Sequence, residues 1–178
     1  MKYKLTKESK QWAGVTLFQI EATASFGSVS KGDKGGWIEK EANLSQEDRS
    51  WVYGDARVYG DAWVSGNAWV YGNAQVYGNA QVYGDAQVYG DAQVYGNAWV
   101  SGDARVYGDA WVSSPLYIQG TRHALTNSRY GHIAIGCHEH TFQYWQENYQ
   151  TIGIANGYTQ AEIEQYGLFI QIFAKIGK

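Results

Sequence analysis

A strict six-residue repeat in the middle of the chain constrains the fold more than any other feature. Valine recurs every sixth residue from Val52 to Val112, and alanine recurs with the same period from Ala56 to Ala110. The repeating unit is V-[YS]-G-[DN]-A-[RWQ]. A period of six does not match the 3.6-residue period of an α-helix. Glycine followed by Asp or Asn is typical of a turn, because these residues tolerate left-handed backbone. Each unit therefore predicts one short strand and one corner.

The alternation of side chains along a strand decides what each repeat position faces. The valine at the middle of each strand points inward, and the residues on either side of it point outward. The alanine near the corner also points inward, where only a small side chain fits. Three such strands close a triangular coil of eighteen residues, and successive coils stack as parallel sheets.

This pattern resembles the hexapeptide-repeat family, whose fold is a left-handed parallel β-helix. The resemblance covers residues 52–112 without a break. Upstream, Ile38 and Leu44 are also six residues apart but out of register with Val52, which indicates a degenerate first coil and a two-residue slip. Downstream, Leu116 and Ile118 continue the alanine and valine periods, so one more rung is expected.

The flanking segments are expected to cover the unpaired sheet edges at the two ends of the β-helix. We expect a mostly β protein with three parts. Residues 1–36 form an N-terminal β-hairpin cap from strands 2–6 and 15–22. Residues 37–120 form the left-handed β-helix. Residues 121–178 form a C-terminal strand and a two-helix module, in which the Thr159–Glu162 segment is a capping box that opens the second helix.

That second helix carries an apolar stripe, formed by Ile163, Tyr166, Ile170 and Phe173. The stripe must pack against the end of the solenoid or against a second subunit. We take these four residues as a candidate oligomerisation surface, and we expect a homo-oligomer, either a dimer or a trimer.

The outer faces of the coils offer a candidate binding surface. Residues eighteen apart stack on one face, and this brings tyrosines into columns. Aromatic and amide ladders stabilise stacked sheets on their own, so regular columns need no further role. Tryptophan is placed less regularly, and exposed Trp and Tyr are enriched where proteins bind partners. The candidate surface consists of Trp63, Trp69, Trp99, Trp111, Tyr53, Tyr71, Tyr89 and Tyr107.

Many hexapeptide-repeat proteins are acyltransferases, and this resemblance would imply a general-base histidine on a coil. Residues 51–113 contain no His and no Lys, which disfavours acyl transfer and leaves no catalytic residue to nominate. The four histidines lie together downstream, where His132, His138 and His140 would share one strand face and suggest zinc. Their spacing matches no established metal signature, and Thr141 is placed to cap a helix. We therefore predict no metal and no cofactor, and we take Cys137 as a small buried hydrophobe.

Charge and composition exclude several partner classes. The net charge is −3, and residues 51–113 contain six Asp against two Arg, so direct nucleic acid binding is not expected. One cysteine gives no disulfide framework, and no apolar run is long enough to span a membrane. We expect a protein of the bacterial cytoplasm.

The flanks carry a second resemblance. The segment GDKGGWIEKEANLS at 32–45 and the segment IAIGCHEHTFQYWQENYQTIG at 133–153 are similar to those of small phage and prophage hexapeptide-repeat proteins of unassigned function. This resemblance implies an origin more than an activity. It leads us to expect a non-enzymatic scaffold that binds a host protein, as an inhibitor of a host defence system such as a CRISPR effector would. The alternatives are a virion or polymer-forming structural protein, a degenerate acyltransferase-like enzyme, and a carbohydrate or small-ligand binder.

Overall fold

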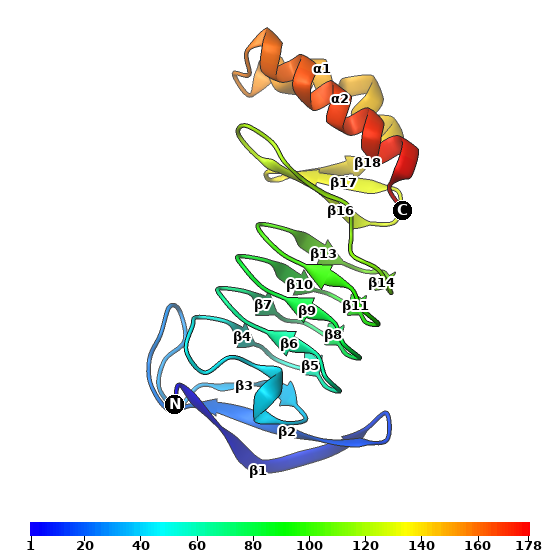
Figure 1. The fold of residues 1–178 in the computed structure, drawn as a ribbon. Helices are drawn as coiled ribbons and strands as arrows, with labels where there is room; N and C mark the ends of the chain where they lie inside the picture. The colour runs from blue at the N-terminus through cyan, green and yellow to red at the C-terminus, as the bar shows by residue number, and fades with distance from the viewer. The chain divides into compact units, whose positions relative to one another are not determined.

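A computed structural model describes residues 1–178 and divides the chain into two compact units. The first unit comprises residues 1–103 and 107–114, and the second comprises residues 104–106 and 115–178. The first contains the repeats except residues 104–106, and the second contains those three residues and both helices (Figure 1).

The first unit begins with three long strands and continues with very short ones. The long strands are β1 (Tyr3–Trp12), β2 (Val15–Ala22) and β3 (Lys34–Ile38), followed by the 3-10 helix η1 (Glu41–Asn43). The short strands of the repeats are β4 (Trp51–Val52), β5 (Arg57–Val58), β6 (Trp63–Val64), β7 (Trp69–Val70), β8 (Gln75–Val76), β9 (Gln81–Val82), β10 (Gln87–Tyr89), β11 (Gln93–Val94), β12 (Trp99–Val100), β13 (Arg105–Tyr107) and β14 (Ala110–Trp111).

The repeats form a parallel β-solenoid of about four coils, as the six-residue period predicts. Strands that are three repeats apart pair in parallel, and Val52 lies opposite Val70 while Val58 lies opposite Val76. One face of the solenoid runs β5-β8-β11-β14, another runs through β4, β7 and β10, and the third runs β6-β9-β12 (Figure 1). The coil therefore has three sides and a period of eighteen residues.

The interior of the solenoid is filled by the two small apolar residues of the repeat. The valines from Val52 to Val106 and the alanines from Ala56 to Ala104 are at most 1% exposed. The corners bring backbone close to backbone. At Gly84, where φ is +72°, an added Cβ would lie 2.9 Å from the backbone nitrogen of Gly102 in the next coil. The repeat glycine is thus required both by left-handed backbone and by the stacking distance.

The N-terminal end of the solenoid is covered by the predicted hairpin. Strands β1 and β2 pair antiparallel, β2 pairs with β3, and β3 continues in parallel with β5. Ile38 lies opposite Val58, and Leu44 bridges Val64, so both pairs are twenty residues apart. The predicted two-residue slip between the degenerate first coil and the repeats is therefore confirmed.

Side chains satisfy backbone groups that have no coil beneath them. The carboxylate of Glu39 accepts a hydrogen bond from Gly60 N at 2.7 Å, and the carboxylate of Asp48 accepts one from Gly66 N at 2.6 Å. The amide of Asn43 donates to the carbonyls of Gly60 and Ala62 at 3.0 and 2.8 Å. These side chains thus take the place of a preceding coil for four backbone groups of the first repeats.

The last rung departs from the repeat. Trp111, and not Val112, lies opposite Val94, so this coil is one residue shorter than the others. Because strand side chains alternate, the one-residue shift buries Trp111 completely and leaves Val112 52% exposed. The inward position at the end of the solenoid is therefore filled by an indole, which buries far more apolar surface than a valine would.

The second unit contains an antiparallel sheet where the sequence analysis expected one further rung and a single strand. Its elements are β15 (Tyr117–Gln119), β16 (Ala124–Arg129), β17 (His132–Ile135), β18 (His138–Thr141), α1 (Phe142–Ala155) and α2 (Gln160–Ile176). Ile118 pairs antiparallel with Leu125, so the expected rung at Leu116 and Ile118 is wrong. The six-residue spacing persists there, but the Gly-Asp corner that closes a coil does not.

Two helices cover one face of this sheet, and both begin as the sequence predicts. Thr141 Oγ1 accepts a hydrogen bond from Tyr144 N at 3.1 Å at the start of α1. At the start of α2, Thr159 N donates to the carboxylate of Glu162 at 2.7 Å, and Glu162 N donates back to Thr159 Oγ1 at 3.3 Å. Neither helix is both long and apolar enough to cross a bilayer.

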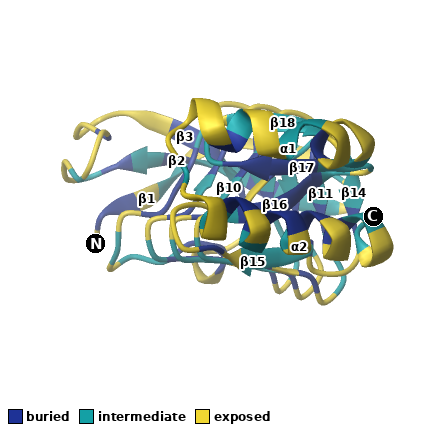
Figure 2. Cartoon of the chain, turned by 90° about the horizontal axis from the view of Figure 1, so that it is seen from above, coloured by how far each residue is buried: buried dark blue, intermediate teal, exposed yellow.

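The apolar stripe of α2 has a partner inside the chain. Figure 2 shows β16 and β17 as largely buried, and it shows buried and exposed residues in turn along both helices. A single core contains Leu125, Ile133, Ile135 and Trp145 together with Tyr166, Ile170 and Phe173 of the stripe. Ile163, the fourth residue of the stripe, is 4% exposed. The assignment of these four residues to an oligomerisation surface is therefore corrected, because the chain's own sheet and α1 already cover them.

Candidate functional site

The tyrosines of the solenoid form ladders that include three residues of the predicted surface. Tyr71 stacks on Tyr89 with ring centroids 5.0 Å apart, and Tyr89 stacks on Tyr107 at 5.2 Å. Tyr53 departs from the ladder, because its ring lies against Trp69 at 5.5 Å and its hydroxyl contacts that of Ser28 at 3.2 Å. All four predicted tyrosines are half-buried, which fits a structural role.

Hydrogen bonds from one coil to the next reinforce these ladders. The hydroxyl of Tyr71 donates to the amide oxygen of Gln87 at 3.3 Å, sixteen residues further on. At the corners, the amide of Asn67 donates to the carboxylate of Asp85 at 2.9 Å, and that of Asn73 donates to Asp91 at 3.1 Å. The Asn and Asp of the repeat therefore pair between coils, a role that the single-repeat pattern does not reveal.

The predicted tryptophans fall into two groups. Trp63 and Trp99 are 45% and 53% exposed on the face formed by β6, β9 and β12. Trp69 is half-buried beside Tyr53, and Trp111 is fully buried. Trp111 is therefore removed from the candidate binding surface, because the register shift turned it inward.

Trp63 and Trp99 lie in one column of this face. Trp63 lies opposite Gln81, and Gln81 lies opposite Trp99. The two indoles are thus two rungs apart, which places them about 10 Å apart along the sheet. Gln81 between them is half-buried, and sequence reasoning did not include it in the site, although its eighteen-residue spacing from both tryptophans was visible. We refer to Trp63, Gln81 and Trp99 as the Trp face.

One of the two corner columns beside the Trp face is acidic. The corner column that follows β6, β9 and β12 contains Asn67, Asp85 and Asp103, and the repeats contain no lysine. On the opposite edge, Asp61 is paired with Lys40 at 2.8 Å. The Trp face therefore presents two indoles next to carboxylates.

The histidines do not form the predicted cluster. Strands β17 and β18 pair so that Ile133 lies opposite His140 and Ile135 lies opposite His138. His132 lies opposite Thr141, one residue out of phase, and so faces the other side of the sheet. The arrangement of all three on one face is wrong, because the chain turns at Gly136 and Cys137. No group of three or more potential ligands is placed to hold a metal.

The turn at Gly136 and Cys137 determines the surroundings of His140 and of Cys137 itself. Burial and the neighbouring His138 lower the pKa of His140, whose ring packs 4.2 Å from that of Tyr144. Cys137 lies at the exposed tip of the turn, so the prediction that it is a buried hydrophobe is wrong. Both residues lie outside the coils of the solenoid, so neither provides the general base that an acyltransferase would need there.

Comparisons with known proteins agree with the solenoid. The model of the YdcK β-solenoid repeat matches residues 52–66, 74–90, 80–96, 92–103 and 98–114. A protein of Escherichia coli (strain K12) named "Uncharacterized acetyltransferase YdcK" is 37% identical over 60 residues, which represent 29% of this chain and 18% of that protein. The chain thus matches only a small part of the length of this relative, and the similarity lies in the repeats.

Proposed function

Since the chain belongs to the β-solenoid repeat proteins, we propose that it is a non-enzymatic scaffold whose Trp face binds a basic surface of a partner protein. The observation that carries this proposal is the exposure of Trp63 and Trp99, at 45% and 53%, in a column whose middle rung holds Gln81. Water-exposed indoles on a rigid sheet cost free energy in isolation, and binding recovers it.

The chemistry of the face favours a cationic partner. Indole rings attract the guanidinium and ammonium groups of Arg and Lys through cation–π interactions. Asp85 and Asp103 at the adjoining corner add carboxylates, which form charge-assisted hydrogen bonds with the same groups. The net charge of −4 in residues 51–113, from two Arg and six Asp, steers positive surfaces toward the solenoid.

The rigidity of the solenoid also favours binding by the Trp face. The valine and alanine columns and the inter-coil hydrogen bonds hold the two indoles at a constant spacing. A pre-ordered surface loses little conformational entropy when a partner binds.

The experiment is capture of partners by the purified protein from bacterial lysate, followed by an affinity measurement with the captured protein. The test variant is Trp63→Ala with Trp99→Ala. The control variant is Ile154→Ala with Leu168→Ala, which removes two hydrophobic side chains that are 69% and 61% exposed in the other unit. Truncating a binding hot spot costs about 2 kcal/mol or more, so each tryptophan should contribute about thirtyfold in Kd.

The expected result is a partner with a basic surface, retained by the control variant, lost by the test variant, and bound more weakly at high salt. Retention of the same partner by the test variant would refute the Trp face. A captured partner with an acidic surface would refute the charge argument.

We propose further that the partner is a component of a host defence system, as a resemblance of the flanking segments to phage and prophage proteins would imply. Plating of phage on defended hosts tests it, with the Trp63→Ala and Trp99→Ala variant as the control. Equal plating with and without the wild-type gene on every defended host would contradict it.

A second candidate function is acetyl transfer, which only the name of the Escherichia coli relative favours. The repeats that match this relative contain no His and no Lys, so they offer no general base of the usual kind. Calorimetry with acetyl-CoA separates the two functions, because a scaffold that binds only a protein should give no heat of binding.

A further inference from the structure

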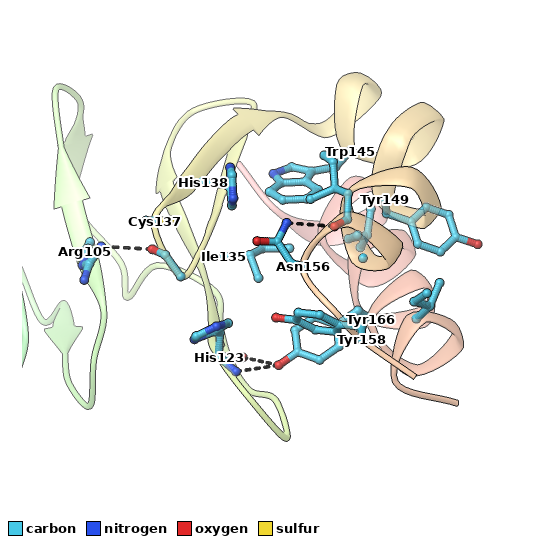
Figure 3. Close-up of a pocket in the computed structure, with 15 residues that line it drawn as sticks. Arg105, His123, Ile135, Cys137, His138, Trp145, Tyr149, Asn156, Tyr158 and Tyr166 are labelled. Carbon is cyan, nitrogen blue, oxygen red and sulfur yellow. Dashed lines mark hydrogen bonds between the residues drawn. The ribbon is translucent and has the colours of Figure 1, made fainter. Parts of the chain in front are cut away.

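The second unit contains a cavity of about 310 Å³ that the Trp face does not involve. Its walls come from the β17–β18 turn, the segment before β16, both helices and the loop between them (Figure 3). This volume is at the lower end of the range for small-molecule pockets, and it corresponds to roughly ten water molecules. A ligand of about ten non-hydrogen atoms would fill it.

Most of the wall is apolar and held in place. Ile135, Ile163 and Ile170 line it together with the ring of Trp145. The indole nitrogen of Trp145 donates to the carbonyl of Ile133 at 2.8 Å, which fixes the ring.

A second aromatic side chain is fixed in the same way. The hydroxyl of Tyr166 accepts hydrogen bonds from the backbone nitrogens of Arg122 and His123, at 3.0 and 2.7 Å, and donates to the carbonyl of His123 at 2.7 Å. The cavity is therefore preformed, so a ligand would not have to order it.

Two imidazoles line the cavity on the side of the β17–β18 turn. His138 lies opposite Ile135 in the hairpin. His123 packs against the turn itself, since a Cβ added at Gly136 would lie 3.2 Å from its Cγ. Figure 3 shows the two rings on either side of the turn that carries Cys137. Neither ring forms a hydrogen bond with the chain, so both have donors or acceptors to offer a ligand.

The side chains that line the cavity include basic residues but no acidic ones. No Asp or Glu lines the cavity, whereas the two histidines and Arg105 do. The guanidinium of Arg105, which belongs to the second unit, donates to the carbonyl of Gly136 at 3.0 Å. Burial raises the pKa of Tyr158 to about 12, so this lining residue stays neutral and adds no negative charge.

From this combination, we propose that the cavity binds a small apolar monocarboxylate, with the apolar body against the isoleucines and Trp145 and the carboxylate toward His123 and His138. An apolar body gains from leaving water, at about 25 cal/mol per Å². The carboxylate would be costly to bury without donors, and the two imidazoles are lining groups whose donors the chain itself does not use.

Isothermal titration calorimetry of the full chain tests this proposal with matched pairs of probes. Octanoate and octan-1-ol share an alkyl body, and 3-phenylpropionate and 3-phenylpropan-1-ol share an aromatic one. The variant is His123→Leu with His138→Leu, which removes both donors, and the control is His132→Leu, whose ring lies on the opposite face of the sheet. Circular dichroism and thermal melting establish that each variant is folded.

The expected result is that at least one acid binds at least tenfold more tightly than its alcohol. This preference should persist in the control and disappear in the double variant, which should still bind the alcohol. The acid that binds better distinguishes a fatty acid from an aromatic acid as the source.

Three results would overturn the proposal. Failure of all four probes to bind would exclude the cavity as a site for this class. Equal binding of acid and alcohol to the wild type would exclude the carboxylate. Preference for the acid in the folded double variant would exclude the two imidazoles as its partners.

Discussion

Replacement of the corner glycine Gly84 by alanine tests how the coils stack. Gly84 has φ of +72°, and an added Cβ would lie 2.9 Å from the backbone nitrogen of Gly102. The matched control is Gly54→Ala, because Gly54 has φ of +58° but the nearest atom to its added Cβ, the oxygen of Gly72, is 3.9 Å away. In both variants alanine must adopt left-handed backbone, which costs free energy. Only in Gly84→Ala does the added Cβ also force two coils apart.

The expected destabilisation follows from these two contributions. Left-handed backbone costs a residue with a Cβ about 1–2 kcal/mol. Inserting an atom into a well-packed contact costs about 1–3 kcal/mol more. Gly54→Ala should therefore lose about 1–2 kcal/mol of unfolding free energy, and Gly84→Ala should lose about 2–5 kcal/mol. In a chain of this size each kcal/mol lowers Tm by about 2–4 °C.

Thermal and urea unfolding, followed by circular dichroism, measure both variants against the wild type. Asparagine separates the two contributions, since it tolerates left-handed backbone but carries the same Cβ. Gly54→Asn should therefore be close to wild type, while Gly84→Asn should remain destabilised. If Gly84→Ala and Gly54→Ala lose equal stability, the close contact between corners is not what requires glycine.

Three further predictions concern the ends of the solenoid and the second unit. Although burial opposes it, hydrogen bonds from Ser50 and from backbone N–H groups hold the pKa of Asp48 below its ordinary value of 3.8. Its contribution to stability is present above that value and is lost as the pH falls through the lowered folded-state pKa, so urea unfolding of Asp48→Asn should lose less stability on acidification than the wild type does. Tyr166→Phe removes the partner of three backbone groups and should cost at least about 1–3 kcal/mol in urea unfolding; an unchanged midpoint would contradict this. Gly167→Ala places a Cβ 2.7 Å from the ring of Tyr149 where the helices meet, and should cost about 1–3 kcal/mol unless that ring swings aside, which near-ultraviolet circular dichroism would reveal.

The candidate site shows which side-chain positions the repeat pattern predicts correctly and which it does not. Trp63 and Trp99 were found from sequence because their outward position follows from the strand period alone. Trp111 occupies the same place in its repeat, yet it is buried, because the last coil closes one residue early. Repeat position does not reveal a change in coil length, which depends on what fills the end of the solenoid.

The histidines show a second feature that a sequence pattern does not predict, namely a turn that interrupts the alternation of a strand. A continuous strand from His132 to His140 satisfies the alternation, but Gly136 adopts φ of +58° and the chain reverses there. The hairpin then pairs Ile135 with His138, so His138 joins the cavity and His132 does not. The sequence predicts the solenoid or a second subunit as the partner of the α2 stripe, whereas the stripe packs on the chain's own antiparallel sheet and α1. That sheet has no repeating period by which the sequence could reveal it.

The amino-acid sequence alone predicts the solenoid, with its three-sided coil, its valine and alanine interior and the two-residue slip at Ile38, and it predicts the capping of both helices. Each of these depends on residues close together in the chain, or on a period that repeats. The register of Trp111, the placement of the histidines on two faces of a sheet and the cavity of the second unit become visible only in the folded chain. These features depend on which distant segments pack together, and that choice is made by the fit of side chains that share no spacing in the sequence.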